Sequence, residues 1–471
     1  MTNKKPHTDS SGNGARQTQR ADPRPTYFLS VSLTDVRCFT EEQTLDLSDG
    51  RGRPARWTIL LGNNGTGKTT ALQALAFLAE RTAVELRQIG APGAEAKSKR
   101  TMRKVALKDV EDQFFRGWGA SGKINATVVS GPLMDGERAG RQPQSITLDK
   151  KGSAEYPGIW HSEFSYPNDC PVCYGYGTSR RLGKGALGES ESDNSTASLF
   201  SYYTDLRNAE EWLLRLDYSS KASDRRSEQR ARLEQVKQLL LAILPEGEVK
   251  DVRFAVGTGV NPVSRVEFST PYGWVPLRQL GYGYQTLIAW MVDLASRMME
   301  RYPDSPNPLA EPAVVLVDEI DLHLHPTWQR QLIGHLTKNF LNTQFIATAH
   351  SPLVVQAAPA DANIAVLRRE GDHVVIDNDA KAVRGWRVDQ VLTSDLFGLP
   401  TARPPQFDDL LKRRTELRSK GRLTAAEKRE LTKVEEQIGD LPYGETAAQA
   451  EDMKLIKETL ELLKKDQATK P

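Results

Sequence analysis

The stretch ILLGNNGTGKTTALQALAFLAE, residues 59–80, decides the fold. An apolar run that begins at Trp57 ends in glycine, and leucines at helical spacing follow residue 70, so the pattern predicts a buried strand, a loop and a helix. The loop GNNGTGKTT fits GxxxxGK[ST], the phosphate-binding P-loop, which requires this strand–loop–helix context. Its glycines let backbone N–H groups turn toward phosphate oxygens, and the helix N-terminus adds the positive end of its dipole. The sequence therefore predicts a nucleotide site.

This loop supplies most of the predicted nucleotide-binding residues. Lys68 is expected to reach the β- and γ-phosphates of ATP, which also makes it a predicted catalytic residue. The hydroxyl of Thr69 is expected to bind Mg²⁺. The predicted ATP-binding residues of the loop are Gly62, Asn63, Asn64, Gly65, Thr66, Gly67, Lys68, Thr69 and Thr70.

Two further apolar strands end in residues that suit ATP hydrolysis. In AVVLVDEIDLHLHP, residues 313–326, the apolar run ends at Asp318, a carboxylate for Mg²⁺, and Glu319 follows as the expected general base toward the attacking water. QFIATAH, residues 344–350, ends in His350, whose imidazole can hydrogen-bond the γ-phosphate or that water. The alternative is structural: the two carboxylates cap the next helix, and the histidine has no role in catalysis.

A fourth segment, RQLGYGYQTLIAW at residues 278–290, opens a predicted helix. The order of the four segments resembles that of ABC-type ATPases, and within them the branch that contains SMC, Rad50 and RecF proteins. The family's signature Leu-Ser-x-Gly-x-Gln falls on residues 280–285, with Gly281 in place of the serine. The resemblance implies that Gly281, Gly283 and Gln285 bind the ATP held by a second subunit, so that a dimer encloses two nucleotides.

The chain departs from this family pattern in two ways. Gly281 lacks the hydroxyl that is expected to contact the γ-phosphate across the dimer, so hydrolysis is expected to be slow. No glutamine is identified for the family's Q-loop. Arg180, in the segment YGTSRR at residues 176–181, has two interpretations that stay open: a part in nucleotide sensing, or an ordinary solvated arginine.

Three longer segments of the sequence indicate a more specific family. LVDEIDLHLHPTWQ, TQFIATAHSPLVVQ and WRVDQVLTSDLFGL are similar to bacterial anti-phage defence ATPases, in particular the PtuA-like ATPase subunits of Septu and related retron systems. The resemblance covers roughly residues 27–465. It implies an ATPase that forms a homodimer or higher oligomer and works with an HNH-nuclease partner, whose activity depends on the nucleotide state of the ATPase.

Composition fits a soluble cytoplasmic protein. The 63 Lys and Arg against 61 Asp and Glu give a net charge of +2, which argues against a broadly basic nucleic-acid coat. No apolar run approaches the roughly 20 residues of a membrane span, and no apolar stretch follows the basic N-terminus. Three cysteines in 471 residues cannot form a disulfide framework, as expected in a reducing cytoplasm.

Strands that alternate with helices predict an α/β fold. We expect an ABC-type ATPase head with a mostly parallel central sheet and an antiparallel subdomain, an inserted lid with a short helical arm, and a helical C-terminal tail. The expected parts are a disordered tail (1–26), the N-terminal lobe of the head with the P-loop (27–85), an insertion (86–270) with a core strand near 170–176 and an arm near 205–244, the C-terminal lobe (271–400) and a partner-binding tail (401–471).

Three other groups of residues are interpreted as not forming a metal or nuclease site. Cys170 and Cys173 lack the second pair that a zinc site needs. In this family the segment with His323 and His325 lies at the subunit-facing loop, so the resemblance implies a dimer contact and not a metal site. Asp377 and Asp379 resemble the acidic pair of a Toprim nuclease, but a strand with the required glutamate and a following helix does not precede them, so intrinsic nuclease activity is not expected.

The alternative function is a DNA-repair or chromosome-structure ATPase that clamps DNA directly, like RecF or Rad50. Such proteins gather Lys and Arg on the upper surface of the dimer, and their DNA binding weakens steeply with salt. Here RRSEQRAR and LKRRTELRSK interleave basic with acidic residues, which is typical of solvated helix faces. Direct or indirect contact with DNA stays open.

Overall fold

The structure is a computed structural model. It describes residues 25–89, 122–133, 143–153, 156–164, 171–184, 194–222, 226–245, 247–256, 264–379, 385–399 and 401–439. Most of the predicted N-terminal tail, Cys170 and the end of the predicted C-terminal tail lie outside these residues. Residues 1–388 form one compact unit and residues 389–471 form a second, so the division falls before residue 401, where the sequence predicts the tail to begin.

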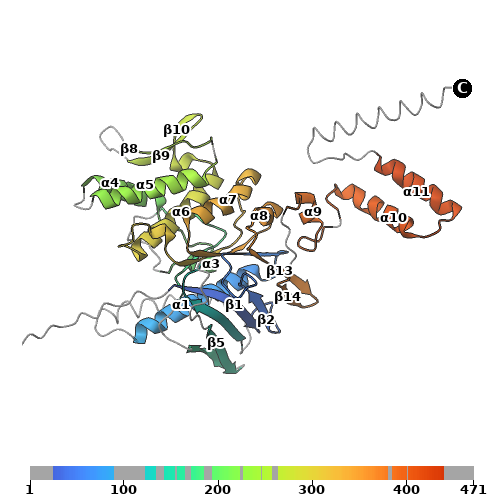
Figure 1. The fold of residues 1–471 in the computed structure, drawn as a ribbon, viewed down its shortest axis with the longest axis horizontal. Helices are drawn as coiled ribbons and strands as arrows, with labels where there is room; N and C mark the ends of the chain where they lie inside the picture. The colour runs from blue at the N-terminus through green and yellow to red at the C-terminus, as the bar shows by residue number, and fades with distance from the viewer. Residues whose placement is uncertain are drawn as a thin grey trace, which may run out of the picture. The chain divides into compact units, whose positions relative to one another are not determined.

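A six-stranded sheet forms the centre of the first unit (Figure 1). Its strands, in spatial order, are β14 (His373–Asp377), β13 (Asn363–Glu370), β3 (Trp57–Gly62), β12 (Thr343–Thr348), β11 (Ala313–Val317) and β7 (Cys173–Tyr176). All are parallel except β14, which returns antiparallel beside β13. The inner strands β11 and β12 are buried at every position. The uninterrupted apolar sequence of β11 predicts this for a strand covered on both faces, whereas β12 also buries Thr343, Gln344 and Thr348.

A second, antiparallel sheet of five strands belongs to the same unit. Its order is β2 (Gln43–Asp46), β1 (Thr26–Thr34), β4 (Gly122–Ser130), β5 (Gln144–Ser153) and β6 (Tyr156–Phe164). The sequence predicts only β4 in the region 88–160, and that prediction is incomplete, because β5 and β6 also lie there. The segment KKGS within β5 is too polar to read as a strand, and β5 is defined instead by its antiparallel pairing with β4 on one side and β6 on the other.

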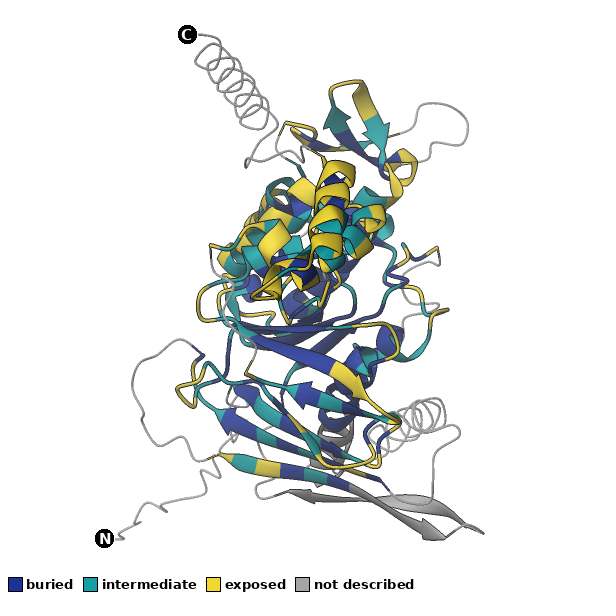
Figure 2. Cartoon of the chain, turned by 90° about the vertical axis from the view of Figure 1, so that its right-hand side faces the viewer, coloured by how far each residue is buried: buried dark blue, intermediate teal, exposed yellow. Residues whose placement is uncertain are grey.

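Helix α1 (Lys68–Ile89) lies between the two sheets, and it contacts β3, β11 and β12 of the central sheet and β4 of the antiparallel one. Apolar residues of α1, of both sheets and of the loops beside them form one buried cluster. The rings of Trp57 and Phe345, on β3 and β12, stack with centroids 4.4 Å apart. Figure 2 shows the central strands as buried over most of their length. The helix that begins at the P-loop is therefore anchored in a buried apolar cluster that both sheets share.

The opposite face of the central sheet is covered by other helices (Figure 1). These are α6 (Tyr282–Arg301), α7 (Pro326–Asn339) and α8 (Pro352–Ala357). The shorter α3 (Ala197–Phe200) contacts β7 and α1. With helices on this face and a parallel sheet at the centre, the predicted mixed α/β class is confirmed.

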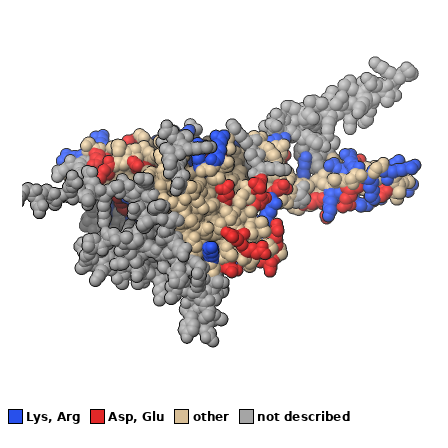
Figure 3. Space-filling view, turned by 60° about the horizontal axis from the view of Figure 1, so that its bottom comes forward, with Lys and Arg blue, Asp and Glu red and all other residues tan. Residues whose placement is uncertain are grey.

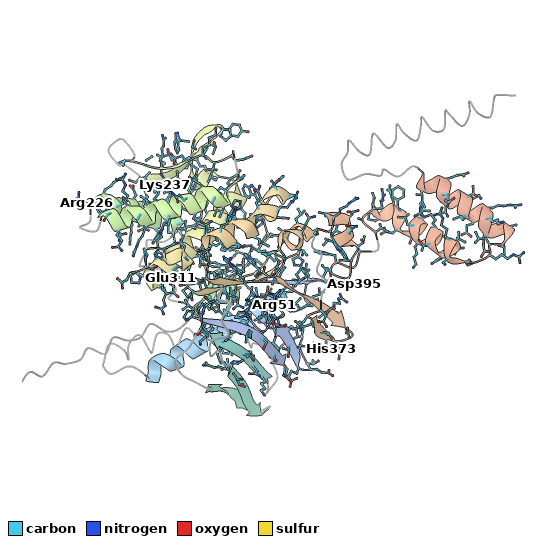
Figure 4. The ribbon with its side chains drawn as sticks, viewed as in Figure 1. Arg51, Arg226, Lys237, Glu311, His373 and Asp395 are labelled. Carbon is cyan, nitrogen blue, oxygen red and sulfur yellow. The ribbon has the colours of Figure 1, made fainter. Side chains whose placement is uncertain are left out.

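The helical arm predicted near residues 205–244 consists of α4 (Ala209–Ala222) and α5 (Arg226–Ile243). The two helices contact each other and pack on α6, and α5 also contacts α7. A three-stranded sheet of β10 (Gly273–Pro276), β9 (Arg265–Thr270) and β8 (Val252–Ala255) adjoins them. Lys237, which Figure 4 labels on α5, pairs with Asp251 before β8 at 3.5 Å. The insertion thus contacts the helix that carries the signature segment.

The second unit contains a helical hairpin of α10 (Asp408–Ser419) and α11 (Ala425–Ile438). A short helix, α9 (Val388–Leu392), spans the start of the unit. Arg413 and Arg418 of α10 pair with Glu430 and Glu435 of α11 at 2.7 and 2.6 Å. Figure 3 shows basic and acidic side chains interspersed along the hairpin, as the sequence predicts for solvated helix faces.

Candidate nucleotide-binding site

The P-loop between β3 and α1 adopts a backbone that only glycine tolerates. Gly62, Gly65 and Gly67 have φ angles of 143°, 78° and 83°. A Cβ at Gly62 would lie 2.4 Å from the carbonyl oxygen of Leu367, and one at Gly67 would lie 2.5 Å from Sγ of Cys38. Neighbouring atoms therefore leave no room for a side chain at Gly62 or Gly67, whereas at Gly65 only the backbone conformation disfavours one.

Lys68 sits within this loop and is buried. Its Nζ donates to the carbonyl oxygens of Gly62 and Asn63 at 2.8 and 2.9 Å. Burial lowers the pKa of Lys68, and the carboxylates of Asp318, Glu319 and Asp321 oppose that shift. The ammonium is thus held inside the curve of the loop, where a phosphate chain would meet it.

Thr69 and Asp318 come together across the sheet. Thr69 Oγ1 donates to Asp318 Oδ2 at 2.8 Å, and Thr348 Oγ1 donates to Oδ1 of the same carboxylate at 2.7 Å. A hydroxyl and a carboxylate are hard oxygen ligands of the kind that Mg²⁺ prefers together with phosphate oxygens and water. No group of three or more His, Cys, Asp or Glu side chains suited to a metal occurs among the described residues. The donor set therefore fits Mg²⁺ carried by a nucleotide better than a metal bound by protein alone.

Glu319 is held by its backbone while its side chain is left available. Its φ angle of +48° is unusual for a residue with a side chain. Its N–H donates to Thr348 Oγ1 at 2.6 Å, and its carbonyl oxygen accepts from Arg180 Nη2 at 2.6 Å and from the Leu322 N–H at 3.0 Å. Its carboxylate has no hydrogen-bond partner within the part of the chain that the structure describes. This arrangement suits a base that must meet a water molecule.

His350 lies just beyond β12, the neighbour of the strand that ends before Asp318. It is exposed, and its backbone N–H lies 3.3 and 3.2 Å from the two carboxylate oxygens of Asp321. Because parallel strands β11 and β12 end at the same edge of the sheet, His350 and Glu319 emerge on the same side. The imidazole makes no hydrogen bond to a described residue.

The signature segment begins α6 and contacts the loop that follows β11. Gly281 is the N-cap of α6, and Gln285 Nε2 donates back to the carbonyl oxygen of Leu280 at 2.7 Å. A Cβ at Gly283 would lie 2.4 Å from the carbonyl oxygen of His323, and the rings of Tyr282 and His323 meet edge to face at 4.9 Å. Among the described residues, no hydrogen bond joins this segment to the P-loop of the same chain.

The structure adds two residues that the sequence does not single out, and it corrects one interpretation of Arg180. Thr348 bridges Asp318 and Glu319, and its only sequence signal is a hydroxyl at the end of the short apolar run FIA. Arg37 Nη1 donates to Gln73 Oε1 at 2.8 Å and to Thr70 Oγ1 at 3.3 Å, beside the start of α1. Arg180 is only 3% exposed, so its interpretation as a solvated arginine is wrong.

The remaining candidates lie apart from this cluster. Asp377 pairs with Arg368 at 3.4 Å and accepts from the backbone N–H of Asp379 at 3.1 Å. His325 caps the start of α7 by accepting from the N–H of Thr327 at 3.4 Å. Within the described ranges, none of the helices has the length and apolar character that a bilayer crossing requires.

Comparisons with known proteins show what the chain is similar to. Residues 184–356 match a family described as "AAA domain, putative AbiEii toxin, Type IV TA system", a range that contains Asp318, Glu319 and His350. Septu protein PtuA of Bacillus mycoides (strain KBAB4) is 27% identical over 364 residues, which cover 76% of this chain and 43% of that protein. The "Retron Ec83 probable ATPase" of Escherichia coli is 38% identical over 128 residues, which cover 27% of this chain and 22% of that protein.

The predicted resemblance to ATPases of anti-phage defence systems is thereby confirmed, although the match spans less than half the length of either relative. Among solved structures, an SMC head bound to the C-terminal winged-helix domain of ScpA aligns with 74% of this chain and 97% of that chain, at 13% identity and a TM-score of 0.44. A likeness of this size supports no inference about the site.

Proposed function

We propose that the chain binds and hydrolyses ATP and that its nucleotide state regulates a partner protein in anti-phage defence. The observation that carries the proposal is the cluster at the carboxyl ends of β3, β11 and β12. There the Lys68 ammonium, the Thr69–Asp318 pair and the Glu319 carboxylate supply the kinds of group that phosphoryl transfer to water uses.

Each residue then has a defined part. The loop N–H groups and Lys68 hold the phosphate chain, and Thr69 and Asp318 would hold Mg²⁺, which when bound neutralises charge on the β- and γ-phosphates. Glu319 accepts a proton from the attacking water, and His350 orients that water or the γ-phosphate. The residues Asn63, Asn64, Gly65 and Thr66 complete the phosphate cradle.

A second copy of the chain is proposed to complete the site. Gly281 and Gly283 offer N–H groups at the start of α6, a helix of 20 residues, and the N-terminus of such a helix favours an anion. Their segment is not bonded to its own P-loop within the described residues, so it is available to cover the nucleotide of another subunit. Closure of this kind responds to ATP only because ATP binds the closed state more tightly.

The partner is proposed to be an HNH-type nuclease, because the relatives include a protein named as the PtuA component of Septu. Cleavage of DNA is assigned to that partner and not to this chain, since Asp377 is already paired with Arg368. The variant Asp377→Ala should therefore leave DNA cleavage by the complex unchanged.

ATP hydrolysis by the purified chain tests the central claim. Glu319→Gln should lower kcat by roughly 100-fold or more, the usual scale of general-base catalysis, while a fluorescent ATP analogue still binds. Lys68→Ala should abolish that binding. The control Glu370→Gln changes a carboxylate at the exposed end of β13 and should have no effect. Hydrolysis at the wild-type rate by Glu319→Gln would contradict the assignment.

The regulatory claim requires the complex. The experiment compares DNA cleavage by a co-purifying nuclease in two complexes. The Glu319→Gln complex with ATP remains in the ATP-bound state, whereas the Lys68→Ala complex cannot bind ATP. The two complexes should cleave DNA at different rates. Equal cleavage rates in the two complexes would contradict regulation of the nuclease by nucleotide state, but would not contradict ATP hydrolysis by the chain.

A further inference from the structure

Arg180 is a buried cation beside the predicted catalytic residues. It follows β7, the strand next to β11, and the backbone carbonyl of Tyr176 at the end of β7 accepts from the Asp318 N–H at 2.8 Å. The Arg180 side chain reaches the backbone carbonyl of Glu319, the residue that follows Asp318. Burial lowers the pKa of Arg180 to about 10, against the opposing effect of Asp318, Asp321, Glu319 and Tyr282, so the guanidinium is charged at neutral pH.

The contact that Arg180 makes is with backbone. Its Nη2 donates to the carbonyl oxygen of Glu319 at 2.6 Å, a charge-assisted hydrogen bond of the stronger class. The carbonyl belongs to the residue whose side chain is the expected base. A cation that served only to balance charge would more simply pair with a carboxylate of Asp318, Glu319 or Asp321.

The peptide that Arg180 holds is strained. Glu319 has φ of +48° and Arg180 itself has φ of +32°, in a region that residues with side chains seldom adopt. Such a conformation persists only where its surroundings impose it. Two side chains impose it on Glu319: Thr348 accepts from its N–H, and Arg180 donates to its carbonyl.

We infer that Arg180 is a positioning residue that holds the Glu319 backbone in the conformation that directs its carboxylate toward the attacking water. This inference rests on the proposed ATPase function and deepens it. Arg180 acts on the reaction through Glu319 and does not touch the nucleotide. Its role is therefore expected in the rate of the chemical step and not in the affinity for ATP.

The variant Arg180→Met removes the donor and keeps an apolar side chain of similar reach. It should lower kcat by about tenfold or more, because a displacement of about 1 Å at a catalytic group has effects of this size. The KM and the Kd for an ATP analogue should stay within about threefold of the wild type. Arg180→Lys, which keeps a charged donor, should recover part of the lost kcat. The matched control is Arg181→Met, a change at the exposed neighbouring arginine, which should change neither constant.

A double-mutant cycle with Glu319→Gln separates positioning from a general loss of structure. If Arg180 acts through Glu319, then adding Arg180→Met to Glu319→Gln should change the residual rate by less than about twofold. If Arg180→Met lowers the rate of Glu319→Gln by the same factor as it lowers the wild-type rate, the inference is overturned. It is also overturned if Arg180→Met weakens ATP binding and leaves kcat unchanged. A wild-type protein without ATPase activity would defeat the proposed function itself, whereas an active wild type with an equally active Arg180→Met would defeat only the positioning role.

Discussion

Two glycines of the signature segment have opposite tolerances for a side chain. A Cβ at Gly281 would find its nearest neighbours at 3.5 and 3.9 Å, both atoms of the Tyr284 ring, which is ordinary contact. Gly281 has φ of −56° and ψ of 148°, a conformation open to any residue at an N-cap. At Gly283 the same atom would overlap the carbonyl oxygen of His323 at 2.4 Å. The departure from the family's serine is thus not required by packing.

Restoring the serine should therefore be structurally harmless. Gly281→Ser is expected to change the free energy of unfolding by only a few tenths of a kcal/mol, and Gly283→Ala to lower it by about 1–3 kcal/mol through overpacking, both measured by urea unfolding. If the absent hydroxyl limits hydrolysis, Gly281→Ser should also raise kcat. A Gly281→Ser protein as unstable as Gly283→Ala would show that the α6 N-terminus is constrained by something other than these contacts.

At the scale of elements, one buried carboxylate links α6 to the strand that leads to Arg180. Asp293 on α6 is 1% exposed and accepts from Tyr176 Oη at 3.0 Å, from Arg297 Nε at 2.8 Å and from the backbone N–H of Arg207 at 3.2 Å. Burial raises the pKa of Tyr176 well above its usual range, and Asp293 adds to that shift. Burial alone would lower the pKa of Arg297, but Asp293 raises it overall.

Removing this carboxylate should be costly. Asp293→Ala leaves Arg297 and the Tyr176 hydroxyl buried without their partner, so the free energy of unfolding should fall by about 3–5 kcal/mol. Urea unfolding followed by tryptophan fluorescence measures the loss. The control Lys221→Ala breaks an exposed pair with Asp217 on α4 and should cost less than about 1 kcal/mol. Equal effects of the two variants would mean that the Asp293 cluster contributes no more than a surface ion pair.

The second unit offers a prediction on pH. Thr424 and Glu427 form a capping box at the start of α11, and the hydrogen bonds from Lys420 and Thr424 lower the pKa of Glu427 to about 2. Because the folded pKa lies below the unfolded value of 4.5, the stabilisation is present above pH 4.5 and is lost as the pH falls toward 2. The protection of amides at the first turn of α11, measured as hydrogen exchange relative to its intrinsic rate at each pH, should therefore fall over that window.

The matched variant Glu427→Gln tests the source of this effect. Without a titrating carboxylate, exchange in the first turn of α11 should no longer depend on pH between 4.5 and 2 beyond the intrinsic chemistry of exchange. If the variant keeps the wild-type pH dependence, the relevant carboxylate lies elsewhere in the hairpin.

At the scale of the whole molecule, the expected consequence of ATP is association. With ATP and Mg²⁺, Glu319→Gln should sediment as a dimer or larger species, because bound nucleotide is not consumed, while Lys68→Ala should stay at the size it has without nucleotide. Sedimentation velocity measures both. If the sedimentation coefficient of Glu319→Gln does not change with ATP, nucleotide-dependent dimerisation is contradicted. The proposed ATP site within one chain would not be contradicted by that result.

Some strands and site residues of the molecule can be predicted from the sequence, and others cannot. The strands of the central sheet are predictable because their burial on both faces leaves continuous apolar runs, as in AVVLV before Asp318. The strands β5 and β6 escape prediction because pairing partners, and not their own side chains, define them. Thr348 and Arg180 escape assignment for a related reason: each acts on the backbone or side chain of a residue distant in the sequence, and no local pattern records such a contact.

The strand that feeds the P-loop pairs only with strands made much later in synthesis. β3 lies between β12 and β13, whose residues follow it by about 290 positions or more. At a synthesis rate of roughly 5–20 residues per second, the ribosome needs on the order of 15–60 s to deliver those partners. Throughout that interval the apolar run at residues 57–61 and the apolar face of α1 have no completed sheet to join. The nucleotide site is therefore expected to fold late, after β12 and β13 have been synthesised.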